Sequence, residues 1–195
     1  MADHSTLDTY RKLGQMPIAW QLTARELICA ANVLYRRYRK MDPATLHKAP
    51  ERPQPLDLHR FHTSAKPILV LYGLAIENLA KAVLVAQGVD ATTAGALNRK
   101  LKHHNLSQLF REARITLDAE TSALLDRLQD FVEAGKYPVG ARAAPELLDG
   151  MMFDEVKRIG RLLDTLEDSL RALKPGIFDT ISKTVLLELC ATDEM

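Results

Sequence analysis

Apolar residues follow helical spacing along most of this chain. The clearest pattern lies near the C-terminal end, where the intervals alternate between four and three residues: Met152, Val156, Ile159, Leu163, Leu166, Leu170 and Leu173. This spacing is typical of a helix that is buried along a single stripe. It predicts a long amphipathic helix over Met151–Leu173, which Lys174-Pro175-Gly176 would end.

Five further helices are predicted from periodicity and from capping residues. Asn105, with Gln108 three residues later, is typical of a capping box, and Asp118 is typical of a second N-cap. Gly135 ends the helix that follows Asp118. The predicted ranges are Pro17–Lys40, Pro67–Gln87, Leu106–Arg114, Asp118–Gly135 and Ile177–Cys190.

The predicted fold is an all-α, up-down bundle of four principal helices, with a short inserted helix and a C-terminal helix. No segment shows strand alternation bounded by hairpin signals. Residues 17–175 would form the bundle, after a polar N-terminal tail over residues 1–16. We interpret residues 176–195 as a helix that either caps the bundle or forms a dimer contact.

The segment 41–64 contains Pro43, Pro50, Pro53 and Pro55. Proline lacks an amide N–H and clashes with the preceding helical turn, so prolines at this density predict an extended excursion across the surface. A connection of this length is more often functional or mobile than a short one.

Composition indicates one globular domain. The chain has 195 residues, of which 47% are hydrophobic and 26% are charged, enough apolar material for a core without disulfides or metals. The formal net charge of +1 argues against a dedicated electrostatic nucleic-acid binder but leaves room for a local basic patch. Cys29 and Cys190 lack zinc-type spacing, which favours two buried, reduced thiols and a cytoplasmic location. We expect no cofactor and no metal site.

The N-terminal residues lack an apolar signal-peptide core, so we expect no secretion signal. The segment Ile68–Ala86 is long and apolar enough to raise the question of a membrane span. Glu77, Asn78 and Lys81 lie at its centre, where charges would be costly in lipid. We therefore interpret it as a core helix and expect no membrane association.

Glu77 and Lys81 lie four residues apart, in the order that favours ion pairing on a helix. Their neighbours are apolar, so Glu77 should be partly buried and should need a partner: Lys81, His104 or Lys136. Two roles remain open for these side chains. They could form a polar cluster that sets helix register, which we favour, or a catalytic acid and base.

His103 and His104 precede a predicted helix N-terminus, close to Arg99, Lys100 and Lys102. This arrangement could hold a phosphate. In the alternative interpretation, one histidine packs beneath the capped turn and the other is solvated. The HxxH pair in the proline-rich segment lacks nearby cysteines or carboxylates, so it does not predict a metal site.

Three motifs together resemble HEPN-type domains, which are small helical bundles. The sequence LAIENLAKA at residues 74–82 resembles their AIE-x-LLKA helix, and LKHHNLSQL at residues 101–109 resembles their H-D-L-x-x-L helix start. The sequence GKYP at residues 135–138 resembles the G-R-Y-P of one bacterial branch. The order and spacing also match, and the resemblance covers residues 65–175.

The resemblance implies a set of binding residues in this chain, although two positions differ. Asn105 stands where the family has Asp, and Lys136 where it has Arg. Asn caps a helix but cannot form an ion pair, and Lys cannot make the bidentate contact of Arg. The candidate binding residues are Glu77, Lys81, Lys102, His104, Lys136 and Tyr137.

Catalytic members of the family are metal-independent ribonucleases with an Arg-x4-6-His motif in the last core helix, assembled across a dimer. This chain has no histidine after His104. The motif is matched only at Arg52–His59, in the proline-rich segment, and at Arg99–His104.

The resemblance therefore predicts a non-catalytic module that binds RNA, a nucleotide or a partner protein, such as a nucleotidyltransferase, in bacterial stress, toxin–antitoxin or phage-defence biology. A metal-independent ribonuclease using His104 with Arg99 or Lys102 is the alternative. A structural homodimer is the second alternative, with Met151–Leu173 and the C-terminal helix forming an isologous apolar interface.

Overall fold

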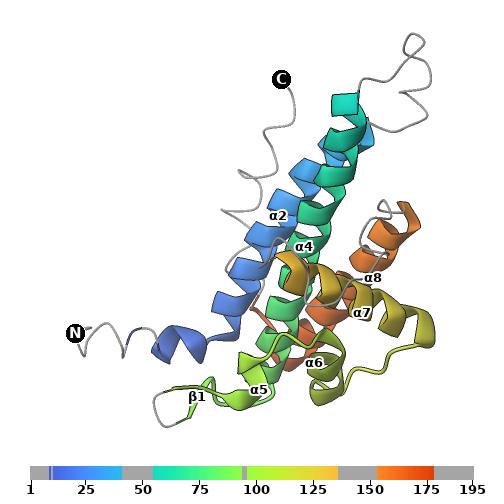
Figure 1. Cartoon of the computed structure of the whole chain (residues 1–195). Coiled ribbons are helices and arrows are strands. Elements are labelled where there is room, and N and C mark those ends of the chain that lie inside the picture. The colour runs from blue at the N-terminus through green and yellow to red at the C-terminus, as the bar shows by residue number, and fades with distance from the viewer. Residues whose placement is uncertain (1–8, 10, 41–54, 94–95, 136–152, 178–195) are drawn as a thin grey trace.

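The computed structural model describes residues 9, 11–40, 55–93, 96–135 and 153–177, and these form a helical bundle (Figure 1). The described elements are α2 (Pro17–Lys40), α4 (Pro55–Ala86), β1 (Thr92–Thr93), β2 (Ala96–Leu97), α5 (Arg99–Lys102), α6 (Leu106–Glu112), α7 (Ala119–Gly135) and α8 (Phe153–Leu173). The predicted all-α bundle is confirmed.

Helix α4 is the centre of the fold, and α2, α6, α7 and α8 all pack against it. Figure 1 shows α2 and α4 running side by side along most of their length. The side chains of Ile68, Ile76 and Leu79 on α4 are fully buried, as are those of neighbouring residues around the helix. A helix that is apolar on all sides must be covered by other elements, because its burial is the main source of folding free energy.

The segment Ala65–Ala86 is long and apolar enough to cross a membrane, and 78% of its apolar window is buried inside the fold. Glycine allows one of the covering helices to approach closely. A Cβ atom added at Gly73 would lie 2.6 Å from Val132 Cγ2 and 3.3 Å from the carbonyl oxygen of Leu128. Helix α7 therefore crosses α4 at a point where only glycine fits without displacement.

The start of α4 contradicts one prediction. Residues 55–64 were expected to belong to an extended excursion, but they are helical and α4 begins at Pro55. Proline is well tolerated at the first helical position, where its missing N–H would have no partner. Pro67 lies inside the helix and is itself exposed, and it has no amide N–H to bond the carbonyl four residues earlier. The rest of the excursion, residues 41–54, lies outside the described residues.

The β1–β2 ladder and the short helix α5 were not predicted. Thr92 pairs with Leu97, and Thr93 with Ala96, in a small antiparallel ladder. The basic run that follows forms α5, where Asn98 Oδ1 accepts a hydrogen bond from the Lys100 amide at 3.0 Å. Strands of two residues carry too little alternation to be recognised in a sequence.

The two predicted N-caps are confirmed. Asn105 Oδ1 accepts a hydrogen bond from the Gln108 amide at 2.8 Å, and Asp118 Oδ1 accepts one from the Thr121 amide at 2.7 Å. The capping box predicted at α6 is only half formed. The Gln108 side chain donates to Glu112 Oε1 at 2.8 Å instead of returning to the Asn105 amide.

The middle of the apolar stripe predicted for α8 is confirmed and faces the core, whereas Leu173 at its C-terminal end is 39% exposed. Ile159, Leu166 and Leu170 are fully buried, and Leu163 is nearly so. The middle of this stripe is therefore covered within one chain, and the dimer interface that the sequence suggested stays a prediction. The helix predicted after Ile177 lies outside the described residues.

The predicted polar tail is described only at residue 9 and from residue 11 onwards. Residues 11–14 are helical, and the carbonyl oxygen of Gly14 accepts a hydrogen bond from Trp20 Nε1 at 2.9 Å. This bond attaches the tail to the first turn of α2.

Candidate functional site

Glu77, Lys81 and His104 meet at one point, and we call them the polar cluster. Lys81 Nζ lies 2.5 Å from Glu77 Oε1. His104 Nδ1 lies 3.0 Å from each carboxylate oxygen of Glu77. The predicted pairing of Glu77 with Lys81 and His104 is confirmed. The third predicted partner, Lys136, lies outside the described residues, as does Tyr137.

Burial makes the Glu77–Lys81 pair unusual. Each of these two side chains is only 5% exposed, whereas that of His104 is 43% exposed. An ionised group loses most of its hydration at such a position, so each charge depends on its partner. The i, i+4 spacing on α4 brings the carboxylate and the ammonium together without any long-range constraint.

His104 is positioned by the loop between α5 and α6. Leu101 on α5 and Leu106 on α6 are fully buried, so both ends of this loop are held against the core. The Asn105 cap starts α6 directly after His104. The histidine therefore comes to α4 from a segment 27 residues away in sequence.

The tautomer of His104 follows from its contact. An ionised carboxylate can only accept hydrogen bonds, so Nδ1 carries the proton and its N–H group donates a hydrogen bond to Glu77. Nε2 is then the ring nitrogen that is not used by the cluster. In the neutral imidazole it carries a lone pair, and in the protonated form it is a second donor.

Trp20 on α2 is a fourth contributor that the sequence analysis missed. Lys81 Nζ lies 5.7 Å from the centroid of the indole ring, within cation–π range. The neighbouring Gln21 is fully buried, and neither of its side-chain amide atoms has a hydrogen-bond partner among the described residues. A single tryptophan and a glutamine on an otherwise apolar helix face were the only signals in the sequence.

His103 faces a different partner. Its Nδ1 accepts a hydrogen bond from the Asn105 amide at 3.2 Å, and its Nε2 lies 3.8 Å from Glu112 Oε1. The imidazole is 24% exposed, so it packs against the capped turn of α6. One of the two interpretations of the histidine pair is thus confirmed for His103, whereas His104 is tied to Glu77.

The cations of α5 lie on the surface beside His104. Arg99, Lys100 and Lys102 are exposed, while Leu101 between them is buried. None of the three cations forms an ion pair with a residue that the structure describes. Their charges are therefore available to an anion at the same edge as the outer face of His104.

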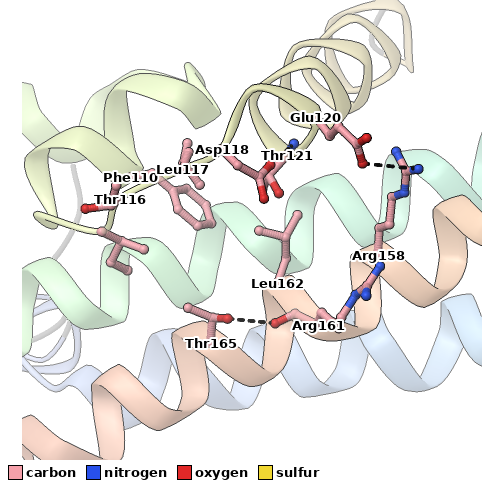
Figure 2. Close-up of a pocket in the computed structure, with 11 residues that line it drawn as sticks. Phe110, Thr116, Leu117, Asp118, Glu120, Thr121, Arg158, Arg161, Leu162 and Thr165 are labelled. Carbon is pink, nitrogen blue, oxygen red and sulfur yellow. Dashed lines mark hydrogen bonds and ion pairs between the residues drawn. The ribbon is translucent and has the colours of Figure 1, made fainter.

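A concave region lies between the start of α7 and α8. It is a polar cleft of about 370 Å³, and Figure 2 shows Asp118, Thr121, Arg158 and Thr165 around it. Arg158 pairs with Glu120 at 3.3 Å. Hydrogen bonds from Thr121 lower the pKa of Asp118, and Arg158 and Arg161 lower it further. Because two carboxylates face two guanidinium groups, the cleft has no net preference for an anion.

Within the described ranges, neither the polar cluster nor this cleft is a metal centre. No group of three or more His, Cys, Asp or Glu side chains is placed there to hold an ion. Comparison of the chain with protein-family models, with curated proteins and with solved structures finds no match. The function is therefore inferred from the geometry of the polar cluster and from the motifs that contain its residues.

Proposed function

We propose that this protein is a non-catalytic HEPN-like module that binds a phosphate-bearing ligand, RNA or a nucleotide, on the surface around His104. One observation carries the proposal: the buried Glu77–Lys81 pair holds His104 at the surface, beside three exposed cations that have no carboxylate partner among the described residues. Two of the three motifs that resemble the family contain the residues of the polar cluster, which also supports the proposal.

The arrangement separates a structural part from a binding part. Glu77 and Lys81 neutralise one another inside the bundle and so contribute no net charge to a ligand. Arg99, Lys100 and Lys102 supply positive charge at the surface, and His104 adds a donor or an acceptor. The formal net charge of the whole chain is only +1, so the attraction for phosphates would come from these local cations and not from the chain as a whole.

Fluorescence anisotropy with a labelled single-stranded RNA tests the proposal. Three phosphate contacts on a single strand correspond to a slope of about −2 in log K against log salt. We expect Lys102→Glu to weaken binding about tenfold and to make this slope shallower. Lys157→Glu is the matched control, because Lys157 is an exposed lysine of α8 that pairs with the exposed Asp154. Binding that is insensitive to salt, or equally affected by both variants, would contradict the proposal.

The second candidate is a metal-independent ribonuclease, and the orientation of His104 favours it. Glu77 accepts a hydrogen bond from the Nδ1–H group of His104, which leaves Nε2 to take a proton from a ribose 2′-hydroxyl, while Arg99 or Lys102 would stabilise charge on the phosphate. Purified protein incubated with total RNA in EDTA distinguishes the two candidates. We expect intact RNA. Cleavage that is abolished by His104→Ala would establish the nuclease instead, and cleavage that survives the substitution would indicate a contaminant.

A further inference from the structure

The polar cleft between the start of α7 and α8 combines apolar side chains with charged groups at its rim. Phe110 and Leu162 line it and are buried, whereas Asp118 and Arg161 are exposed. Figure 2 shows Leu162 pointing from α8 towards the side of the cleft that carries Asp118. Its volume of about 370 Å³ lies within the range of small-molecule sites, which is roughly 300–1,000 Å³. The size and the mixed lining suit a small amphipathic molecule.

The wall of the cleft at residues 115–118 is held by hydrogen bonds at both levels of its attachment. The Ile115 amide donates to the Phe110 carbonyl at 3.0 Å, which fixes the wall to α6. The Gln87 side-chain amide donates to the Ala113 carbonyl at 2.8 Å, which ties the end of α6 to the chain directly after α4. A ligand would therefore meet a wall that is already in place, and little ordering would be needed on binding.

One pair of opposite charges in the cleft is closed, and the other is open. Arg158 pairs with Glu120 at 3.3 Å. Arg161 forms no ion pair with a residue that the structure describes, and the same is true of Asp118. The positive charge of Arg161 still contributes to the lowered pKa of Asp118, of which the hydrogen bonds from Thr121 are the larger cause. Asp118 and Arg161 therefore lie near one another, on opposite sides of the cleft, without pairing.

The open pair selects for a ligand that carries both charges. A simple anion would be repelled by the two carboxylates of the cleft, and a simple cation by the two guanidinium groups. A free α-amino acid carries an ammonium and a carboxylate on the same carbon at neutral pH. A guanidinium binds a carboxylate through two parallel hydrogen bonds, and a carboxylate accepts hydrogen bonds from an ammonium. An aliphatic or aromatic side chain on the ligand would bury apolar surface against Leu117 and Leu162.

We propose that the cleft between α7 and α8 binds a free α-amino acid with an apolar side chain, with its carboxylate on Arg161 and its ammonium on Asp118. None of the residues that line the cleft belongs to the polar cluster. The proposal is therefore independent of any ligand at His104.

NMR titration of the full chain with L-leucine and with L-phenylalanine tests the proposal. Three analogues each lack one part of the ligand: N-acetyl-L-leucine lacks the ammonium, L-leucinamide lacks the carboxylate, and glycine lacks the apolar side chain. We expect each of them to bind at least about tenfold more weakly than L-leucine. L-Leucinamide that binds as tightly as L-leucine would overturn the proposal, as would the absence of binding by both amino acids.

Two variants separate the two charges. Asp118→Asn removes the carboxylate but keeps a residue that caps α7, so it should weaken L-leucine about tenfold and leave N-acetyl-L-leucine unchanged. Arg161→Gln should weaken L-leucine about tenfold and leave L-leucinamide unchanged, because that analogue has no carboxylate. Arg171→Gln is the matched control, since Arg171 is an exposed arginine of α8 that pairs with Asp168 outside the cleft. A variant that weakens L-leucine and the analogue without the matching group equally would contradict the assigned orientation, and an equal loss in Arg171→Gln would contradict the site.

Discussion

Glu77→Gln is the most informative perturbation of this fold. The amide has nearly the shape of the carboxylate but carries no charge, so it leaves the Lys81 ammonium, which is 5% exposed, without a counter-charge. His104 keeps an acceptor but loses the charged one. Removing one partner of a buried ion pair costs about 3–5 kcal/mol. We expect a loss of about 3 kcal/mol, the lower end of this range, because Lys81 retains the Trp20 ring.

Lys81→Met should cost less, about 1–2 kcal/mol, because Glu77 still has His104 as a partner. The double variant removes both buried charges. Buried pairs replaced by neutral groups of similar size are often close to neutral in stability, so we expect the double variant to lose about 1 kcal/mol. The two single losses should therefore fail to add, with a coupling energy of about 3–4 kcal/mol.

Urea denaturation at pH 7, followed by circular dichroism, measures these differences. A loss of about 3 kcal/mol corresponds to a decrease in Tm of about 6–12 °C for a chain of this size. Glu120→Gln is the control, because its ion pair with Arg158 is exposed and should be worth less than about 1 kcal/mol. Additive single losses would refute the view that the pair stabilises the bundle. Lost RNA binding with an unchanged Tm would show that Glu77 acts in function.

Three further predictions test the packing. Gly73→Ala should destabilise the fold by about 1–3 kcal/mol in urea denaturation, because its Cβ would clash with Val132. Gly160→Ala should instead stabilise α8 by about 0.5–1 kcal/mol. Equal effects of the two variants would contradict the close approach of α7 to α4 at Gly73. Burial raises the pKa of Tyr72 to about 12. The stability that its neutral hydroxyl contributes is therefore present below pH 10 and is lost as the pH rises through about 12. Tyr72→Phe should remove this loss of stability at alkaline pH from a pH series of melting curves. Asn105→Ala should cost about 1 kcal/mol in the same denaturation assay, and Asn105→Asp should restore it, because both Asn and Asp cap the first turn of α6.

The helix limits show which parts of the fold could be predicted. The ends of α2 and α7, and the C-terminal end of α8, agree with the predicted positions to within a residue, because capping and periodicity are encoded over a few neighbouring residues. The predicted start of α4 was wrong because proline has two different effects on a helix. It ends a helix in the interior but begins one at the first position, and only the surrounding packing distinguishes the two.

The pairing of Glu77 with Lys81 was determined by the sequence alone. Both residues lie on one helix at a spacing that brings their side chains together, and the apolar residues around them require the burial. The choice between His103 and His104 was not determined in this way. The two are neighbours in sequence, and either could have reached α4.

Tertiary structure decided that choice. Anchoring of Leu101 and Leu106 in the core turns His104 towards Glu77 and leaves His103 beside Glu112. The contact of Trp20 with Lys81 and the cleft between α7 and α8 were decided in the same way. Local spacing determines which residues share a helix face, because the backbone repeat is fixed. Which faces meet depends on how all the helices bury their apolar surface at once, and that balance is a property of the whole chain.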